Sequence, residues 1–328
     1  MKVLVLNQSE VELLLPMDEC ISVMEEAFVA LARGEVEQPL RTIFRAPNVK
    51  GVMAMMPTFR GGERPLFGLK AICVFPGNAT VGKDAHQGGV LLFDGVTGEL
   101  LAIANASAIT AIRTAAVSAL ATKVLAKEDA GDLALIGAGV QARKHLESIA
   151  CVRSLRSVRV AASRFENAKR FANEMQAAAS VPIEAVETAE LAVRGADLIV
   201  TATTAREPVI NREWISDGAH INAIGTFSPK AREIDSATMS AAHVFTDRRE
   251  SAFNEAGDYL LAAQEGMIGP EDVAELGEVL IGSNPGRRSR VEITLFKSLG
   301  LAIEDLAAAF HAYQKARHHS LGSWVNFE

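Results

Sequence analysis

The sequence predicts an α/β protein in two parts, because its hydrophobic pattern changes character once along the chain. Up to about residue 122, short strand-like segments are separated by turn residues, which is typical of an α+β unit with an antiparallel sheet. From Gly131 onward, buried strands alternate with helices, which indicates a parallel sheet with right-handed crossovers. We therefore expect one domain at residues 123–302 and a second at residues 1–122 and 303–328.

The segment Leu133–Arg143 indicates which parallel fold this is. It reads LALIGAGVQAR, an apolar strand followed by the spacing G-x-G-x-x-A and then by a helical pattern. In a Rossmann fold the first glycine makes a tight turn, the second lets a pyrophosphate approach the backbone, and a small third residue lets the helix pack on the strand. The phosphates bind free N–H groups at the helix N-terminus. The dinucleotide contacts expected here are Gly137, Gly139, Val140 and Gln141.

The remaining strands of this part follow at regular intervals. A helix near Glu166 follows the second strand. Because cofactors lie at the carboxyl ends of such strands, we expect contacts from Thr201, Ala202 and Thr203. The predicted strands after the first are 157–162, 183–186, 198–202, 219–224 and 244–246.

The first part combines strands with two long helices. Asp18 looks like the N-cap of a helix that ends before Gly34, and an alanine-rich helix spans 108–125. A last helix at 301–314, with the tail at 320–328, is expected to return to this part. The predicted strands are 3–6, 42–44, 52–56, 69–75, 90–93 and 100–105.

Composition limits the classes of partner. The chain has 328 residues and a formal net charge of −7, which argues against nucleic acid or an anionic membrane. Its three cysteines lie far apart and form neither a disulfide framework nor a metal-ligand spacing, so we expect a reducing cytoplasm and no bound metal. The apolar start is too short for a signal peptide, and no uncharged apolar stretch reaches the ~18 residues that span a bilayer.

The residues after the second strand bear on which dinucleotide binds. NAD sites usually place an acidic residue at the end of this strand, on the ribose 2′-hydroxyl. Here the strand ends at Ser163 and Arg164 instead, and the guanidinium suits a 2′-phosphate. The alternative is that Arg164 is a solvated loop charge. The sequence therefore favours NADP(H), with NAD(H) possible.

Three basic residues lie within or beside apolar segments of the first part: Arg41, Lys70 and Arg113. Burying a charge without a partner is expensive. Either a substrate carboxylate supplies that partner, or each basic residue pairs with a protein acid or extends to the surface. The spacing does not decide between these interpretations.

Seven segments in order carry a family likeness over essentially the whole chain. They resemble the ornithine cyclodeaminase and mu-crystallin family. The segments are QPLRT at 38–42, FGLK at 67–70, HQGGVLLFD at 86–94, TAIRTAAVS at 110–118, GAGVQA at 137–142, INAIG at 221–225 and SLG at 298–300.

By that resemblance, Arg41, Lys70 and Arg113 match the substrate-carboxylate ligands, and we expect Lys70 and Arg113 to carry catalysis. His86, which we place in a loop, is either a proton donor at the substrate or a structural histidine. The resemblance also implies a homodimer through the strand-rich domain, with the cofactor site facing that domain across a cleft. It adds these cofactor contacts: Thr114, Ile224, Gly225, Ser298 and Gly300.

Two positions depart from the cyclodeaminase pattern. Phe227 stands where cyclodeaminases have a catalytic aspartate, and Ala54 aligns with a glutamate. Neither side chain can pair with an ammonium group or accept a proton. The run around Phe227 resembles instead the branch that reduces imines or ketimines, which would place Phe227 against the substrate.

The sequence therefore predicts an NAD(P)-dependent oxidoreductase that reduces the C=N bond of a small α-imino acid. The substrate is either cyclic, such as 1-pyrroline-2-carboxylate or 1-piperideine-2-carboxylate, or an open-chain imine of a 2-oxo acid. An iminium is already protonated, so losing the aspartate need not prevent hydride addition. The alternatives are an ornithine cyclodeaminase-type ammonia-lyase, an alanine-type amino-acid dehydrogenase and a non-catalytic NADPH-dependent binding protein.

Three acidic residues stay without an assigned role. Asp247 follows a predicted strand, and we interpret it as a turn residue in preference to a group near the nicotinamide. Glu255 and Asp258 follow a family-like pattern, but the sequence does not indicate what they do.

Overall fold

The computed structural model describes residues 2–328 and divides the chain into two compact units. Unit 1 comprises Met1–Thr114 and Gly300–Glu328, and unit 2 comprises Ala115–Leu299. The boundary falls within helix α3 (Ala106–Leu125).

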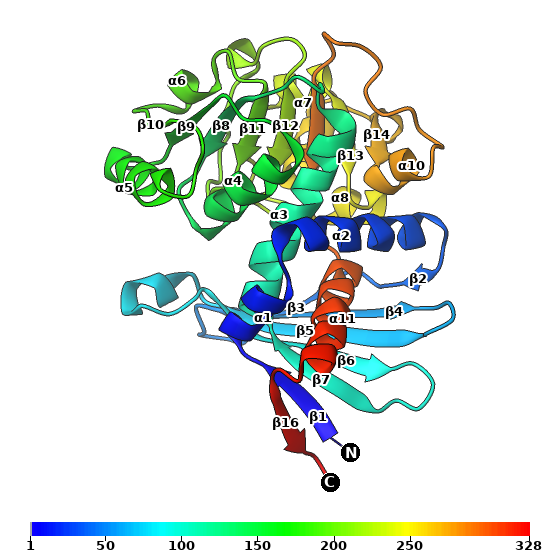
Figure 1. Cartoon of the computed structure of the whole chain (residues 1–328). Coiled ribbons are helices and arrows are strands. Elements are labelled where there is room, and N and C mark those ends of the chain that lie inside the picture. Colours follow the sequence, from blue (N-terminus) through cyan, green and yellow to red (C-terminus); the bar gives the residue numbers. More distant parts are fainter. Residues whose placement is uncertain (1) are drawn as a thin grey trace. The chain divides into compact units, whose positions relative to one another are not determined.

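Unit 2 is built on a fully parallel sheet, as the alternation of strands and helices predicted (Figure 1). The strand order is β10-β9-β8-β11-β12-β15-β13-β14. The sequence analysis missed the short strands β14 and β15, and β15 lies between β12 and β13. The strands are β8 (Asp132–Ile136), β9 (Ser157–Ala161), β10 (Ile183–Ala185), β11 (Leu198–Thr201), β12 (His220–Ala223), β13 (His243–Thr246), β14 (Val273–Glu275) and β15 (Thr294–Lys297).

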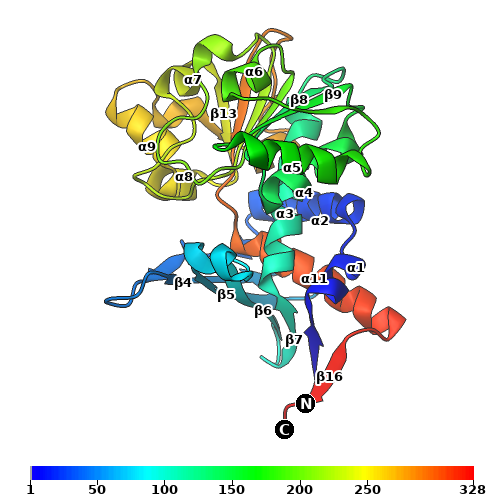
Figure 2. The ribbon, with the colours of Figure 1, turned by 90° about the vertical axis from the view of Figure 1, so that its left-hand side faces the viewer.

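Alternate residues of β8 belong to two hydrophobic cores, one on each face of the sheet. Leu133 and Leu135 pack with α4 and α5, whereas Ala134 and Ile136 belong to the core that includes residues of α7, α8 and α9. Figure 2 shows these two sets of helices on opposite sides of the strands. The helices are α4 (Val140–Val152), α5 (Phe165–Gln176), α6 (Ala189–Val193), α7 (Ser236–Ala241), α8 (Arg249–Glu255), α9 (Gly257–Gln264) and α10 (Leu276–Leu280), with 3₁₀ turns η2 (Arg212–Trp214) and η3 (Pro270–Asp272).

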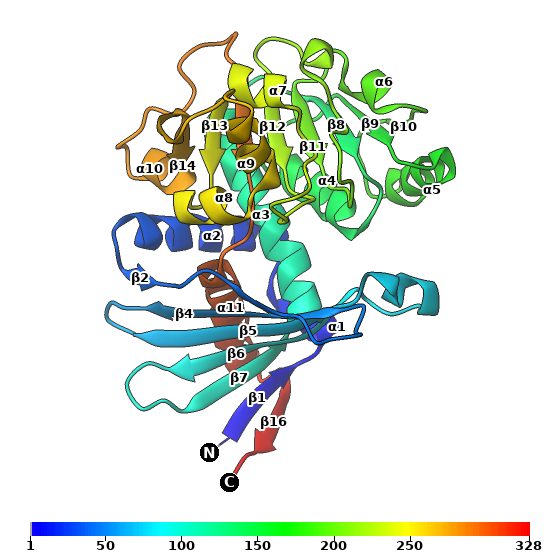
Figure 3. The ribbon, with the colours of Figure 1, turned by 180° about the vertical axis from the view of Figure 1, so that it is seen from behind.

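Unit 1 contains an eight-stranded sheet in the order β16-β1-β7-β6-β5-β4-β2, with β3 paired to β4 (Figure 3). All pairs are antiparallel except β1 with β7. The tail of the chain supplies the edge strand β16. The strands are β1 (Lys2–Leu6), β2 (Val36–Glu37), β3 (Thr42–Phe44), β4 (Val52–Arg60), β5 (Leu66–Val74), β6 (His86–Asp94), β7 (Leu100–Asn105) and β16 (Ser323–Asn326).

One face of this sheet is covered by helices and the other presents apolar side chains. Helix α11 (Ala302–His319) packs on β4, β5 and β6, and α2 (Met17–Ala32) packs on α11. A Cβ at Gly68 of β5 would lie 2.9 Å from a methyl carbon of Leu306, so the helix lies close to the strand. On the opposite side, Phe67 is 49% exposed and Met53 is 40% exposed.

Two details of the N-terminal region differ from the prediction. Asp18 is not the N-cap of α2, because the helix begins at Met17 and Pro16 occupies that position. Asn7 caps an additional helix, α1 (Gln8–Leu14), through a reciprocal pair of hydrogen bonds with Glu10. This S/T/D/N-x-x-E pattern starts a helix, and here it marks α1, which the sequence analysis does not predict.

Helix α3 is long and apolar enough to span a membrane by length and composition, but 78% of its most apolar window is buried within the protein. Four fully buried neutral side chains connect it to unit 2. His145 Nδ1 lies 2.7 Å from the Gln141 carbonyl and Nε2 lies 2.9 Å from Ser118 Oγ. Thr122 donates to the Ser118 carbonyl, and Asn222 of β12 donates to Thr122 Oγ at 2.9 Å.

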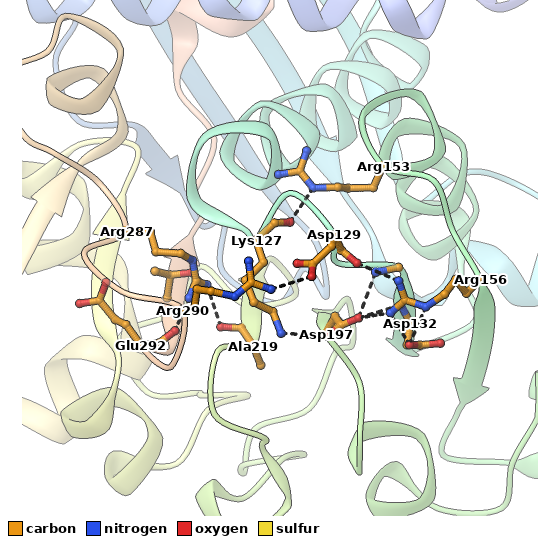
Figure 4. A network of polar contacts seen from close by, with 12 residues as sticks. Lys127, Asp129, Asp132, Arg153, Arg156, Asp197, Ala219, Arg287, Arg290 and Glu292 are labelled. Carbon is orange, nitrogen blue, oxygen red and sulfur yellow. Dashed lines mark hydrogen bonds and ion pairs between the residues drawn. The ribbon is translucent and has the colours of Figure 1, made fainter.

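Arginines donate to carbonyl groups in the last turn of α3 and just after it. Arg153 donates to the carbonyls of Thr122 and Lys127, and Arg287 donates to that of Leu125. Figure 4 shows the surrounding network, which continues through Asp197 at the amino ends of the parallel strands. The glycine-rich turn lies at the other end of these strands, their carboxyl end.

Two buried histidines make stability depend on pH. Burial lowers the pKa of His145 to about 4 and that of His220 to about 3, from 6.5. Below pH 6.5 the unfolded chain binds protons that the folded chain excludes, so stability is full above this value and falls as the pH decreases. Urea unfolding should show little change between pH 7.5 and pH 6.5, and below pH 6.5 a loss that approaches about 1.4 kcal/mol per pH unit for each histidine down to pH 5.

The variant His145→Gln should make this slope shallower, since it removes one of the two titrating groups. His318→Asn, at an exposed position of α11, should leave the slope unchanged. A stability that is constant or that rises over this range as the pH falls would contradict the assignment.

Candidate active site

The glycine-rich turn after β8 has the shape that a dinucleotide requires. Gly137 has φ +115°, and a Cβ there would lie 2.4 Å from the Ala202 carbonyl oxygen, so only glycine fits. Gly139 is the N-cap of α4, and a Cβ there would meet no atom within 4 Å. Ala142 is buried where α4 packs on the sheet. The open space before the first N–H groups of α4 fits a pyrophosphate.

Four other residues that we expect to contact the cofactor lie near this turn, and their side chains differ in how exposed they are. Val140 is 60% exposed at the start of α4, and Gln141 has a buried side-chain oxygen without a hydrogen-bond partner among the described residues. Ser163 and Arg164 are exposed after β9, where Arg164 is the N-cap of α5. Strand β9 neighbours β8, so these residues lie at the same edge of the sheet as the glycine-rich turn.

Buried Glu233, which the sequence analysis missed, supports the loops that follow β11 and β12. Its carboxyl group accepts hydrogen bonds from Thr201 Oγ at 3.0 Å, from the Thr203 N–H at 2.8 Å and from Thr203 Oγ at 2.7 Å. It also accepts the Gly225 N–H at 2.6 Å. The expected residues Thr201, Thr203 and Gly225 therefore meet at one carboxyl group. No sequence motif that we recognised marks Glu233.

Asp258 has a structural role that the sequence did not indicate. Its Oδ1 accepts the N–H groups of Glu233 and Ile234, at 2.7 and 3.0 Å. Its Oδ2 lies 2.9 Å from the ammonium of Lys297, and both side chains are buried. Lys297 also donates to the Thr226 carbonyl at 2.8 Å. This ion pair fixes the segment after β12 against the end of β15.

Asp247 is buried, and its carboxylate accepts the backbone N–H groups of Leu299 at 2.6 Å and Arg248 at 2.9 Å. These bonds support our interpretation of Asp247 as a turn residue. Ser298, an expected cofactor contact, has a buried hydroxyl without a hydrogen-bond partner among the described residues. A bound dinucleotide could satisfy that hydroxyl. Ala202 and Ile224 are half-buried at the ends of their strands.

Three basic residues of unit 1 converge on the start of α11. Lys70 Nζ lies 2.7 Å from Asp305 Oδ2, and Arg113 contacts Glu304 at 2.6 Å and Asp305 at 3.1 Å. Arg41 donates to the Gly300 carbonyl at 2.9 Å. The side chains of Lys70 and Arg113 are only 2% and 4% exposed.

These ion pairs give Lys70 and Arg113 partners within the protein. The partners that burial of Lys70 and Arg113 requires are the protein acids Glu304 and Asp305, so a substrate carboxylate is not needed to neutralise them. The sequence offered one signal for this pairing, which is the presence of two adjacent acids at the start of the predicted last helix. Gly300 has φ +78°, and a Cβ there would lie 2.6 Å from the Arg113 guanidinium, so this position requires glycine.

The electrostatics of this basic cluster lower two pKa values. Burial lowers the pKa of Lys70 to about 8, and the positive charges of Arg113 and Arg41 act in the same direction, while Asp305 opposes them. Burial, Lys70 and Arg113 also lower the pKa of His86. A lysine with this pKa can hold or release a proton near neutral pH.

Four further residues that the sequence singled out are placed as follows. His86 is half-buried as the first residue of β6, opposite Val74, and not in a loop as expected. Phe227 lies in the segment after β12 and is 43% exposed. Thr114 is buried in α3, and Ala54 is buried in β4. Among the described residues, no three His, Cys, Asp or Glu side chains form a group that could hold a metal ion.

The two glycines of the turn predict contrasting variants. Gly139→Ala should fold with nearly unchanged stability, because the added methyl meets no protein atom, but should weaken dinucleotide binding about 10-fold or more by occupying the phosphate path. Gly137→Ala should lower the unfolding midpoint, because of its positive φ and the contact with Ala202. Thermal unfolding and cofactor titration measure both. Full cofactor affinity in Gly139→Ala would refute this placement of the phosphates.

Comparison with known proteins identifies the family of this chain. A model of the ornithine cyclodeaminase/mu-crystallin family matches residues 1–320. Ketimine reductase mu-crystallin of Mus musculus is 40% identical over 280 residues, covering 85% of each chain.

Two solved structures are also similar. Delta(1)-pyrroline-2-carboxylate reductase of Thermococcus litoralis, in complex with NADH and L-proline, superposes with a TM-score of 0.94 at 40% identity, covering 98% of this chain and 100% of that one. An archaeal alanine dehydrogenase dimer with bound NAD gives a TM-score of 0.93 at 36% identity and full coverage of both chains. The chain therefore belongs to the ornithine cyclodeaminase/mu-crystallin family.

Proposed function

We propose that this protein reduces the C=N bond of a small α-imino acid with NAD(P)H as hydride donor. The ketimine reductase and pyrroline-carboxylate reductase relatives support this reaction class. The dinucleotide fit at Gly137 and Gly139 supports the cofactor class. The observation that carries the proposal is the convergence of three basic side chains at the start of α11, Lys70 and Arg113 on Glu304 and Asp305 and Arg41 on the Gly300 carbonyl.

The basic cluster suits a substrate carboxylate even though protein acids already neutralise part of it. Mutual repulsion among Lys70, Arg113 and Arg41 contributes to the low pKa of Lys70. An added carboxylate relieves that repulsion, and the guanidinium groups bind it through paired N–H donors. We assign Arg41, Lys70 and Arg113 to carboxylate binding, and the orientation that results brings one face of the imine carbon toward the hydride donor.

When bound, the reduced nicotinamide supplies the hydride that adds to the imine carbon. The C=N electron pair then moves to nitrogen, which carries its proton already if the substrate is an iminium. For a neutral imine, Lys70 is our candidate for supplying that proton, because it retains a proton at neutral pH but holds it weakly. His86 is a second polar group of this unit, and its low pKa keeps it uncharged near neutral pH.

Phe227 and Ala54 distinguish this reaction from amine cyclisation. Cyclodeaminases of the family resemble this chain but carry acids at these positions, and here an exposed phenyl ring and a buried methyl replace them. A reductase needs no carboxylate to hold a second amino group. We therefore propose that Phe227 contacts the apolar part of a small substrate.

For the cofactor, we propose NADP(H) in preference to NAD(H). The residues after β9 are Ser163 and Arg164, both exposed, with Arg164 at the N-terminus of α5. A guanidinium and a helix N-terminus together favour a 2′-phosphate. The remaining proposed contacts are Thr114, Val140, Gln141, Thr201, Ala202, Thr203, Ile224, Gly225, Ser298 and Gly300.

We further propose a cytoplasmic homodimer formed by unit 1. The sheet face opposite α11 presents Phe67 and Met53 to solvent, and burying such apolar side chains against a second copy would stabilise a dimer. The archaeal alanine dehydrogenase of similar structure is a dimer. In this proposal residues 1–122 and 303–328 bind substrate and dimerise, while residues 123–302 bind the dinucleotide.

NADPH oxidation with defined imines tests the reaction. We expect turnover with 1-pyrroline-2-carboxylate, with 1-piperideine-2-carboxylate, or with pyruvate, glyoxylate or oxaloacetate plus methylamine. Arg113→Lys keeps a charge beside Glu304 and Asp305 but loses the paired donors, so kcat/KM should fall about 100-fold. Arg45→Lys, at an exposed position of unit 1, is the matched control and should be unchanged.

Three results would redirect the assignment. Ammonia released from ornithine without net cofactor oxidation would indicate a cyclodeaminase, and turnover restricted to pyruvate with ammonia would indicate an alanine-type dehydrogenase. NADPH binding without any turnover would indicate a binding protein.

Arg164→Ser tests the choice of dinucleotide. Removing the guanidinium should raise KM for NADPH about 10-fold while leaving KM for NADH unchanged, since only NADPH carries the 2′-phosphate. Arg170→Ser, at an exposed position of the same helix, is the control. Equal KM changes for both cofactors would contradict the proposed contact.

A further inference from the structure

Glu233 presents a buried carboxyl group surrounded by hydrogen-bond donors. Each of its oxygens accepts one backbone N–H, from Thr203 or Gly225, and one threonine hydroxyl. Burial raises the pKa of this carboxyl, while the ammonium of Lys297 and the donors of Thr203 oppose that shift. The two backbone N–H groups lie one on each oxygen and cannot accept a hydrogen in return, so four contacts of this kind suit the ionised form, which accepts at both oxygens.

The same carboxylate joins the ends of two neighbouring strands. Through Thr203 and Gly225 it holds the segments after β11 and β12, and a Cβ at Gly225 would lie 2.4 Å from it. The segment after β11 in turn touches the glycine-rich turn, because Ala202 packs against Gly137. In a Rossmann sheet the cofactor lies at these carboxyl ends, with the phosphates at the first turn and the nicotinamide half toward the strands on this side.

The charges around Glu233 do not cancel. Lys297 pairs with Asp258 at 2.9 Å, and these two charges neutralise each other. Glu233 adds a further negative charge in a site that excludes water, where a fixed charge acts strongly on its surroundings. The oxidised nicotinamide ring is cationic and the reduced ring is neutral, so a negative charge on this side favours the oxidised form.

We propose that Glu233 is a positioning residue for the cofactor, whose carboxylate sets the segments after β11 and β12 and favours the oxidised ring over the reduced ring. This inference rests on the proposed function, because it assumes a nicotinamide dinucleotide in unit 2. Its effect is to make the bound reduced cofactor a better hydride donor.

Binding of the two cofactor forms, without substrate, tests this role. Dissociation constants for NADP⁺ and NADPH, and for NAD⁺ and NADH, are measured by calorimetry for the full chain and for Glu233→Gln. Removing the charge should weaken binding of the oxidised form about 10-fold more than binding of the reduced form. Thr201→Val removes one donor but keeps the carboxylate, so it should weaken both forms by the same factor.

A second variant keeps the test valid if Glu233→Gln does not fold. Asp258→Asn keeps the oxygen that accepts the Glu233 N–H but removes the charge that pairs with Lys297, so Lys297 is left to neutralise Glu233. Like Glu233→Gln, this variant should weaken binding of the oxidised cofactor more than binding of the reduced cofactor. An unchanged ratio in the folded variants would overturn the electrostatic role of Glu233. Failure of the unsubstituted protein to bind either form would overturn the proposed function instead.

Discussion

Asp305 binds two cations at once, Lys70 and Arg113, and the arrangement of charged groups in unit 1 depends on that carboxylate. An ionised side chain removed from water is costly unless it is paired and hydrogen-bonded. Strand β5 supplies one cation, α3 supplies the other and α11 supplies the acid, so a single ion-pair cluster connects three elements far apart in sequence. Unit 2 applies the same rule with Asp258, which pairs with Lys297 and also binds two backbone N–H groups.

The two clusters suit different tasks. In unit 1 several positive charges lie close enough to lower the pKa of Lys70, which suits an anionic ligand and a proton held weakly. In unit 2 the carboxylates face inward and support backbone segments at the carboxyl ends of β11 and β12. The chain belongs to the ornithine cyclodeaminase/mu-crystallin family and is similar to ketimine and pyrroline-carboxylate reductases. That similarity agrees with an anionic ligand in unit 1 and with supported strand ends in unit 2.

Much of the fold was predictable because its signals are local. The spacing of Gly137, Gly139 and Ala142 after an apolar run predicted both the turn and the parallel sheet around it. Strand β15 escaped prediction, because its pattern is only four residues long and its place between β12 and β13 depends on pairing with distant strands. The start of α2 was misplaced, since proline and aspartate are both common near helix N-termini.

Site residues that interrupt an apolar pattern were predictable from the sequence. Their partners interrupt no such pattern and were not predictable. Lys70 and Arg113 stand out inside apolar segments, but Glu304 and Asp305 look like ordinary acids at the start of a helix. Glu233 likewise lies in a polar stretch, and only the fold shows that it is buried beneath Thr201 and Thr203. Long-range partners of this kind leave no periodic signal.

The discontinuous course of unit 1 has a consequence for how the protein is made. Unit 2 is one continuous segment, so all the strands of its sheet lie within Ala115–Leu299. Unit 1 also needs α11 and β16, which follow the whole of unit 2 in the chain, so unit 2 is translated before unit 1 is complete. Until then Lys70 and Arg113 lack Glu304 and Asp305 as ion-pair partners. The basic cluster can therefore be shielded from water only after α11 has joined the sheet.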